Sequence, residues 1–465
     1  MVNNWSNKKV LVMGLGLHGG AFQVAKWLLK QNAIITITDL RSAAVLRPTL
    51  DKIKRLPKSG QITYILGKHR LADFKDQDLI VQNPGVPPNS KYLVAARKLN
   101  IPIVNEAVMF FGLYSSNIIG VTGTRGKSTT TTLLHQILKT TIKDNVVAGN
   151  IGTTPMFAVL DKLSKKSLPV VELSSWHLEG LADYKRSPHI AVITNILVDH
   201  LNRYKNFAAY KQAKIHIIKN QKQTDIAILN ADNKHTKDLA KYTKAKVYYF
   251  SLHKKVKGVY LKNNHFYFYN NKKESEILST NDVKLLGEHG LSNAAAAICV
   301  AKLVGISNAK IKQAVSRFKG IDYRLQSLGY WKNIEIFNDA TASTPDAAIA
   351  AIQALSQRNV LLIAGGEDKK LDYKFLAKAI KKQIKALILL KGSGSQKLLA
   401  ELKKIKYQPQ ILIKDVASLQ AAWQYAKKNS QDHEVILFSP AAASFNMFVN
   451  EFERARVFES LVKNG

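Results

Sequence analysis

Short apolar runs alternate with amphipathic helical stretches along almost the whole chain. The first block contains the apolar runs KKVLVMG, AIITITD, ITYILG, DLIVQNPGVP and IPIVN, and a helical pattern covers Ala21–Lys30. Apolar runs of about four to eight residues that alternate with helices are typical of parallel sheets covered by helices. The pattern therefore predicts an α/β protein.

The alternation continues in two further blocks, and we predict domains over residues 1–108, 109–318 and 319–465. The second block contains NVVAGNIG, PVVELSSW, HIAVITNI and DIAILNADN, and the third contains NVLLIAGGEDK, KALILLKGSG and EVILFSPAAAS. Between residues 246 and 282, an alternation rich in Lys and Tyr favours antiparallel strands. Two helices are predicted after it, at LSNAAAAICVAKLVGI and NAKIKQAVSRFKG. A length of 465 residues fits about three domains of ~150 residues each.

Composition narrows the functional classes. The net charge is +36, but the lysines are scattered, and no nucleic-acid-binding module accompanies them. We therefore expect no nucleic-acid role, although an anionic small-molecule substrate would benefit from the positive field. The apolar runs are too short to span a membrane, and the glycine-broken N-terminal run predicts a strand and turn, not a signal peptide. The single cysteine, Cys299, excludes an internal disulfide and suits a cytoplasmic protein.

The segment MGLGLHGG places Gly14, Gly16 and Gly19 after a predicted strand and before a predicted helix. Glycines at such a turn let the backbone approach a pyrophosphate at the helix N-terminus. Asp39 ends the next strand about 20 residues on, where its carboxylate can accept a hydrogen bond from a ribose hydroxyl. A tight turn without a ligand is the alternative. The pattern predicts a nucleotide-like ligand without specifying NAD.

The segment VTGTRGKST, residues 121–129, joins a predicted strand to a Thr-rich helix. The Walker pattern G-x-x-x-x-G-K-[ST] needs a glycine where this chain has Val121, so the loop is a degraded motif, a coincidence or another kind of phosphate loop. Backbone N–H groups of Gly123–Gly126 can surround phosphate oxygens, Lys127 can neutralise the terminal phosphate, and Ser128 can ligate magnesium. The position between a buried strand and a helix favours a phosphate site over a chance surface loop.

Further polar side chains follow the strands of the same block. Glu172 ends the run in VELSSW, Asp199 and His200 follow another in DHLNRY, and Lys214 lies on a predicted helix. Each of these alone is more often a cap or a surface group. Because the carboxyl ends of parallel strands meet at one edge of a sheet, together they predict a magnesium site beside the ATP phosphates.

At this point the chain resembles a known family, the Mur ligases of bacterial cell-wall synthesis. The loop TGTRGKST is similar to that family's own phosphate loop, T-G-T-[NR]-G-K-[ST], which answers the question posed by Val121. The resemblance extends over all three blocks, through the segments GLGLHGG, NPGVP, GNIG, ELSSW, DHLNRY, YKQAK, GEHGLSN, DYRLQ, ND, AGGEDK and SPAAAS. It implies a three-domain α/β fold with a Rossmann-like N-terminal domain, a central P-loop-type ATPase domain and a Rossmann-like C-terminal domain.

The resemblance also implies roles for individual residues. The uridine-nucleotide site would be lined by Leu17, His18, Asp39, Asn83 and Gly85. ATP would be bound by Gly123, Thr124, Arg125, Gly126, Lys127, Ser128 and Thr129, with Asn293, Arg324 and Asp339. The muramoyl-peptide would face Asn150 and His177, and the incoming glutamate would meet Lys369, Ser444 and Phe445.

Two magnesium ions are implied, one on Ser128 and Glu172 and a second on His200 and Lys214. Lys214 matches the lysine that the family carries as a carbamate. The catalytic set would then be Lys127, Glu172, His200 and Lys214.

The activity implied is an ATP-dependent ligation of D-glutamate to UDP-N-acetylmuramoyl-L-alanine through an acyl phosphate, in peptidoglycan precursor synthesis. A cytoplasmic monomer without membrane insertion is expected. Two departures from the family pattern bear on this. Arg125 replaces the commoner Asn, and Thr341 stands where a glutamate-contacting lysine is usual, so ligation of L-glutamate or another amino acid is the alternative.

Three rival functions have distinct signatures. A folylpolyglutamate-type ligase shares the second and third blocks but lacks a nucleotide-binding first block. An NAD-dependent dehydrogenase explains the first block alone and leaves the GTRGKST loop without a function. A basic nucleic-acid-binding ATPase would hydrolyse ATP in response to DNA or RNA and would not respond to the muramoyl substrate.

Overall fold

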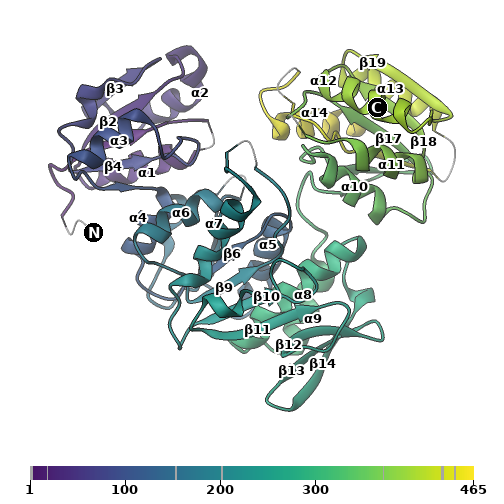
Figure 1. Ribbon diagram of the computed structural model, residues 1–465, viewed down its shortest axis with the longest axis horizontal. Coiled ribbons are helices and arrows are strands. Elements are labelled where there is room, and N and C mark those ends of the chain that lie inside the picture. Colours follow the sequence, from purple (N-terminus) through teal and green to yellow (C-terminus); the bar gives the residue numbers. More distant parts are fainter. Residues whose placement is uncertain are drawn as a thin grey trace. The chain divides into compact units, whose positions relative to one another are not determined.

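The apolar runs of the sequence become the strands of three sheets in the computed structural model, which describes residues 4–17, 19–151, 154–200, 203–369, 371–430, 434–444 and 447–464. Contacts within the chain divide it into two units, whose helices and strands are labelled in Figure 1. One contains Met1–Asp282 and Ser292–Val315 and holds two sheets; the other contains Val283–Leu291 and Ser316–Gly465 and holds the third. The domain boundaries at residues 108 and 318 remain a prediction.

Five parallel strands form the first sheet, in the order β3-β2-β1-β4-β5. Each arises from an apolar run of the first block. The strands are β1 (Lys9–Met13), β2 (Ile34–Asp39), β3 (Ile62–Leu66), β4 (Leu79–Gln82) and β5 (Ile103–Val104), and the helices are α1 (Gly20–Lys30), α2 (Ala43–Lys54) and α3 (Lys91–Lys98). The strand order reverses between β1 and β4, and ligands of open α/β sheets bind at the carboxyl ends of the strands around such a point.

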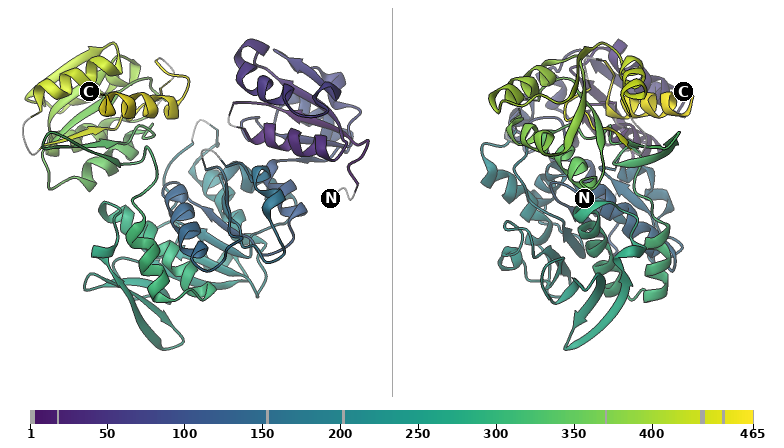
Figure 2. Two further views of the ribbon diagram at one scale, coloured as in Figure 1. Left: turned by 180° about the vertical axis from the view of Figure 1, so that it is seen from behind. Right: turned by 90° about the vertical axis from the view of Figure 1, so that its right-hand side faces the viewer.

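The second sheet has the order β14-β13-β12-β11-β10-β9-β6-β8-β7. Its strands are β6 (Ile119–Thr122), β7 (Val147–Gly149), β8 (Val170–Glu172), β9 (Ile190–Ile193), β10 (Ile226–Asn230), β11 (Lys246–Ser251), β12 (Gly258–Lys262), β13 (His265–Asn270) and β14 (Lys273–Ser279). The predicted antiparallel region is correct only from β12 to β14, because β11 pairs in parallel with both β10 and β12. Strands β13 and β14 project from the body of this sheet as a hairpin (Figure 2).

Six more helices follow in the described part of the first unit, of which α5 and α7 contact strands of the second sheet. They are α4 (Glu106–Leu113), α5 (Lys127–Lys139), α6 (Ser175–Asp183), α7 (Phe207–Lys219), α8 (Gly287–Val304) and α9 (Asn308–Arg317). In α5, for example, Leu133, Leu134 and Ile137 are fully buried at helical spacing. The two helical stretches predicted after residue 290 are confirmed as α8 and α9, and the first residues of α8 belong to the other unit.

The third sheet has the order β15-β16-β20-β17-β18-β19, and only β15 is antiparallel to its neighbour. Its strands are β15 (Gln326–Trp331), β16 (Ile334–Asn338), β17 (Val360–Gly365), β18 (Ile384–Leu390), β19 (Ile411–Val416) and β20 (Val435–Phe438). The helices are α10 (Pro345–Ala354), α11 (Lys374–Gln383), α12 (Ser393–Lys404), α13 (Leu419–Asn429) and α14 (Glu451–Lys463). Helices α10 to α12 share one apolar core with the sheet, and α13 and α14 share another.

The fold thus confirms the α/β class and the alternation of strands and helices. Within the described residues, we find no helix that combines the length and apolar character needed to cross a membrane.

Candidate functional site

The loop between β6 and α5 forms a narrow turn of backbone. Gly123 has φ 154° and Gly126 has φ 80°, and a Cβ atom at either position would overlap Thr194 Oγ1 or Asn293 Oδ1, respectively. Helix α5 begins at Lys127, and its N-cap residue, Gly126, has no side chain with which to cap the helix. A helix N-terminus reached by a loop in which only glycine fits is suited to bind a phosphate group.

Two residues at the end of β9 fix this loop in place. Thr194 Oγ1 donates to the Arg125 carbonyl at 2.6 Å, and Asn195 Nδ2 donates to the same oxygen at 3.1 Å. Asn195 also accepts the Thr124 N–H through its carbonyl and the Arg125 N–H through Oδ1, both at 2.9 Å. The loop is therefore held in one conformation before any ligand binds. Sequence reasoning did not identify Thr194 or Asn195, although the polar end of HIAVITNI was a signal.

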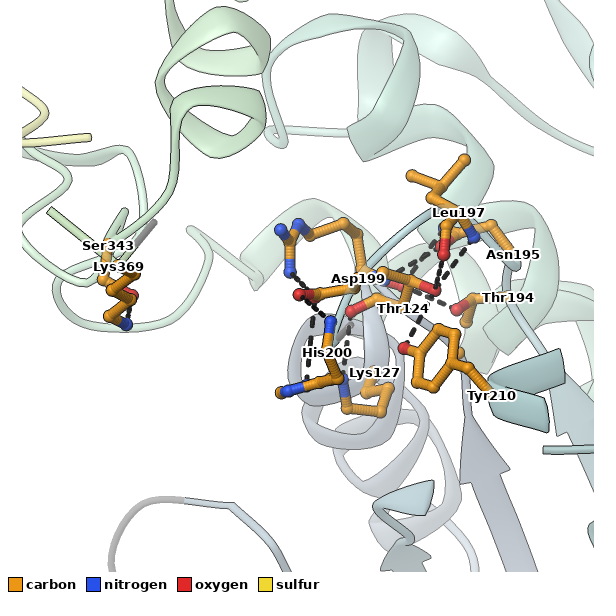
Figure 3. Close-up of polar contacts among 12 residues, drawn as sticks. Thr124, Lys127, Thr194, Asn195, Leu197, Asp199, His200, Tyr210, Ser343 and Lys369 are labelled. Carbon is orange, nitrogen blue, oxygen red and sulfur yellow. Dashed lines mark hydrogen bonds and ion pairs between the residues drawn. The ribbon is translucent and has the colours of Figure 1, made fainter. Parts of the chain in front are cut away.

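Charged side chains gather above the loop. Lys127 Nζ donates to the Thr124 carbonyl at 3.1 Å, and Arg125 forms a 3.1 Å ion pair with Asp199 (Figure 3). Burial alone would raise the pKa of Asp199, but the positive charge of Arg125 and a hydrogen bond from the His200 N–H together lower it. Asp199 therefore remains an anion and orients Arg125 at the loop.

Lys214 is almost fully buried beneath the loop, with 2% of its surface exposed. Its Nζ donates to the Gly123 carbonyl at 2.7 Å and lies 4.8 Å from the centre of the Tyr210 ring. Burial, followed by the nearby charge of Lys127, lowers the Lys214 pKa well below its ordinary value. A lysine in this position can therefore lose its proton far more easily than one on the surface.

His200 has a left-handed backbone conformation with φ 54°. Such a conformation costs on the order of 1–3 kcal/mol for a residue other than glycine, and it persists only where the surroundings impose it. The imidazole ring lies 5.6 Å from the Trp176 ring and 5.7 Å from the Tyr210 ring. Burial, followed by the positive charge of Lys127, lowers the pKa of His200 despite the nearby Asp199. The lowered pKa favours a neutral ring, which can ligate a metal.

Glu172 lies at the end of β8 and is 1% exposed. Its Oε1 accepts a weak hydrogen bond from Asn150 Nδ2 at 3.4 Å, whereas its buried Oε2 has no partner among the described residues. A buried carboxylate oxygen without a donor is costly unless a cation binds it. Ser128, 5% exposed in the first turn of α5, offers a hydroxyl in the same sheet region. Both groups fit a magnesium ion.

The described residues contain no cluster of three or more His, Cys, Asp and Glu side chains arranged to hold a metal. The predicted ligands Ser128, Glu172, His200 and Lys214 would therefore need phosphate oxygens or water to complete a magnesium shell, as is common for this ion.

His177, in the first turns of α6, is 3% exposed, and its Nδ1 has no hydrogen-bond partner among the described residues. Burial lowers the pKa of His177 to about 4. The ring is therefore neutral at physiological pH, and it can donate or accept a hydrogen bond but carries no charge to a ligand.

We expect His177→Gln to make the protein less sensitive to acid. Because the ring binds a proton near pH 6.5 only in the unfolded chain, it stabilises the unfolded state as the pH falls below that value. Between pH 7 and pH 5 this linkage removes about 2 kcal/mol from the free energy of unfolding. Urea unfolding at both pH values should show that the variant loses less stability by about that amount. The surface variant His265→Gln is the control, and equal losses in wild type and His177→Gln would contradict the expectation.

In the first sheet, the glycine turn and two polar residues surround the carboxyl end of β1. Gly14, with φ 87°, packs against the Asn83 side chain, and Asn83 Oδ1 accepts the Gly85 N–H at 3.0 Å. Asp39 accepts the N–H groups of Gly16 at 3.1 Å and of Arg41 at 2.8 Å. Asp39 Oδ2 thus holds the glycine loop while Oδ1 holds the turn after β2, roles that the sequence did not suggest. Leu17 is half-buried beside this loop, and His18 lies outside the described residues.

In the second unit, Asp339 follows β16 and is buried. Its Oδ1 accepts the Leu325 N–H at 3.0 Å and its Oδ2 accepts the Ser439 hydroxyl at 2.7 Å. Burial raises the pKa of Asp339 to about 7 despite these hydrogen bonds. The exposed Arg324 lies between Tyr323 and Leu325, both of which have positive φ, so the backbone of this turn is strained.

Residues predicted to meet the third substrate belong to the same unit. Lys369 Nζ donates to Ser343 Oγ at 2.8 Å, two residues after Thr341 (Figure 3). Thr341 instead donates its hydroxyl to the Tyr323 carbonyl at 2.9 Å. Ser444 is buried, and Phe445 lies outside the described residues. Asn293, in the other unit, accepts a 3.5 Å hydrogen bond from Thr130 of α5.

Comparison with known proteins gives matches along the whole chain. Residues 8–105 match the family described as Mur ligase MurD-like, N-terminal domain; residues 121–301 match the Mur ligase middle domain; and residues 323–442 match the Mur ligase, glutamate ligase domain. The UDP-N-acetylmuramoylalanine–D-glutamate ligase of a Roseiflexus species is 36% identical over 99% of both chains. The enzyme of the same name from Clostridioides difficile is 35% identical over 98% of both.

Solved structures share the fold at lower identity. UDP-N-acetylmuramate-alanine ligase from Thermotoga maritima has a TM-score of 0.64 at 21% identity, covering 98% of this chain and 100% of that one. MurF from Acinetobacter baumannii has a TM-score of 0.61 at 16% identity, covering 99% and 92%. The three-part architecture expected from the sequence is therefore that of solved proteins.

Proposed function

The chain belongs to the Mur ligase family, and from this premise we propose that it is the ATP-dependent ligase that adds D-glutamate to UDP-N-acetylmuramoyl-L-alanine in peptidoglycan precursor synthesis. The observation that carries this conclusion is the identity of about 35% over essentially the full length of several enzymes named for that reaction. The loop at residues 123–126, with Lys127 above it and Lys214 below it, supplies the phosphate chemistry that such a ligation requires.

Two displacements make up the reaction. The terminal alanine carboxylate attacks the γ-phosphorus of ATP, and the bond from this phosphorus to the β–γ bridging oxygen breaks. ADP departs, and the alanine carboxylate has become an acyl phosphate. The glutamate amine then attacks the acyl carbon, loses a proton, and expels inorganic phosphate to give the amide. Every reacting group is anionic until the amine attacks, so charge neutralisation is the main catalytic task.

Residues of this chain are suited to that task. Amides at the start of α5 can donate to a phosphate group, and the Lys127 ammonium at the same loop can neutralise the transferred group. Magnesium, when bound, neutralises phosphate charge and polarises the transferred phosphoryl group. Ser128 and Glu172 would hold one ion, and His200 and Lys214 would hold another.

Lys214 fits this role only in modified form. An ammonium repels Mg²⁺, and among the described residues Lys214 Nζ contacts a carbonyl and an aromatic ring but no carboxylate. Its lowered pKa favours the neutral amine, whose nitrogen can attack carbon dioxide, form a C–N bond and release a proton. The resulting carbamate is an anion with two oxygen ligands. We include this carbamate in the proposal.

The remaining assignments concern the substrates. Leu17, Asp39, Asn83 and Gly85 surround the first-sheet turn suited to the uridine nucleotide, with His18 beside them in sequence, and Asn150 and His177 serve the muramoyl-peptide. Asn293, Arg324 and Asp339 serve ATP, and Lys369, Ser444 and Phe445 serve glutamate. We also propose that the protein is a monomer, and the use of ATP and a UDP-linked substrate supports a cytoplasmic location.

Phosphate release with UDP-N-acetylmuramoyl-L-alanine, ATP and each amino acid in turn tests the function. We expect turnover with D-glutamate and little with L-glutamate. Thr341 makes this test informative, because it stands where a charged lysine is usual in the family. Its hydroxyl donates to the Tyr323 carbonyl and offers no positive charge to an amino-acid substrate. Greater turnover with L-glutamate or another amino acid would leave the ligase class intact and refute the D-glutamate specificity. Phosphate release that requires DNA or RNA would refute the proposed ligase function.

A further inference from the structure

Arg203 joins two segments that carry candidate site residues. Its Nη1 donates to the Pro84 carbonyl at 3.2 Å, and its Nη2 pairs with Glu179 Oε2 at 3.0 Å. The guanidinium also lies 5.0 Å from the centre of the Trp176 ring. Only 18% of the Arg203 side chain is exposed, so water competes weakly for these contacts.

At one end, Arg203 contacts the loop that follows β4. Pro84 stands between Asn83 and Gly85, which form a hydrogen bond across it, and the Asn83 side chain packs against Gly14. These are residues proposed for the uridine-nucleotide site. A ligand that orders this loop therefore also fixes the carbonyl to which Arg203 donates.

The other end of Arg203 belongs to the turn that carries His200. The N–H groups of Arg203 and Tyr204 both donate to the His200 carbonyl at 3.0 Å. The ring of Trp176, which the guanidinium covers, is also the neighbour of the His200 ring. From His200 the contacts continue to Tyr210, whose hydroxyl lies 3.2 Å from Thr124 Oγ1 in the phosphate loop.

We propose that Arg203 is a positioning residue that couples binding of the UDP-linked substrate to binding of ATP. When the substrate orders the Pro84 loop, the Arg203 fork is held at both ends, and the turn keeps His200 in its left-handed conformation beside the phosphate loop. Arginine suits this role because its planar fork bonds the carbonyl and the carboxylate together, whereas a lysine ammonium can hold only one of them well. The inference rests on the proposed function.

Isothermal titration of the full chain measures the coupling directly. The affinities for UDP-N-acetylmuramoyl-L-alanine and for the magnesium complex of a non-hydrolysable ATP analogue are measured separately, and then each in the presence of the other, without glutamate. In the wild type each ligand should tighten the other by the same factor, of order 5–150-fold. In Arg203→Met this factor should fall to near unity, while each ligand alone binds nearly as in the wild type.

Arg203→Lys keeps a charge beside Glu179 and so should preserve folding, yet it should also lose the coupling. The matched control is Arg70→Met, which removes an exposed Arg–Asp pair of 2.7 Å in the first part of the chain without linking two segments; it should keep the coupling. The proposal is overturned if either Arg203 variant retains wild-type coupling. The same holds if both variants weaken the binding of each ligand alone as much as they weaken its binding in the presence of the other ligand. It is also overturned if wild-type enzyme that turns over D-glutamate shows no coupling. Failure of the wild type to bind either ligand would instead refute the proposed function, on which this role depends.

Discussion

Replacing Lys127 with alanine should lower the rate of phosphate release by about 10²–10³-fold or more while the protein stays folded. The Lys127 ammonium lies at the phosphate loop, and its loss removes the positive charge that we propose neutralises the transferred phosphoryl group. Because this charge matters most in the transition state, the loss should appear mainly in kcat. A coupled phosphate assay at saturating D-glutamate measures it.

The matched control for that variant is Lys139→Ala. Lys139 is exposed in the last turn of the same helix, α5, so its removal changes the net charge equally without touching the loop. It should turn over at nearly the wild-type rate. Wild-type turnover by Lys127→Ala would remove the loop from the mechanism.

Replacing Lys214 with alanine should lower activity by at least about a hundredfold, because a buried group proposed to supply an anionic magnesium ligand is lost. The wild type should also slow in buffer freed of carbon dioxide and recover when bicarbonate is added. With carbon-13 bicarbonate, a carbamate resonance should be present in the wild type and absent from the variant.

Lys219→Ala provides the comparison, since Lys219 is exposed at the end of the same helix, α7. It should keep both the activity and the carbamate resonance. The carbamate proposal fails if Lys214→Ala turns over normally, or if the wild type gives no carbamate signal and is indifferent to carbon dioxide.

Much of the fold could be predicted because parallel strands buried on both faces are continuous apolar runs. Val10, Leu11 and Val12 of β1 are nearly inaccessible to solvent, as the run KKVLVMG suggested. The direction of pairing was harder to predict. Strand β11 alternates like the antiparallel strands after it, because alternation reports exposure of one face and says nothing about the orientation of the neighbouring strand.

Three strands of the third sheet, β15, β16 and β19, were not singled out. Strands β15 and β19 lie at the two edges and are only partly buried, so their sequences, QSLGYW and ILIKDV, lack a continuous apolar run. Strand β16 is a short run, IEIFN, interrupted by a glutamate whose side chain reaches the surface.

For the site, sequence could locate residues by motif but not their surroundings. The burial of Lys214 and its contact with the Gly123 carbonyl depend on α7 packing beneath the loop, which no local pattern encodes. The same holds for Thr194 and Asn195, which act on Arg125 across about 70 residues of chain. Sequence motifs identify residues expected to contact ligands. The residues that hold those motif residues in position can be identified only from the three-dimensional structure.

The tight fit of Gly123 and Gly126 has a consequence for inhibitor resistance. An inhibitor that hydrogen-bonds the amides of this loop would depend on backbone atoms, which amino-acid substitution cannot remove. Any side chain at Gly123 or Gly126 would collide with Thr194 or Asn293 and distort the loop that we propose binds ATP. Bacteria under selection by such a compound would therefore have few escape mutations at its contact points that leave a working enzyme.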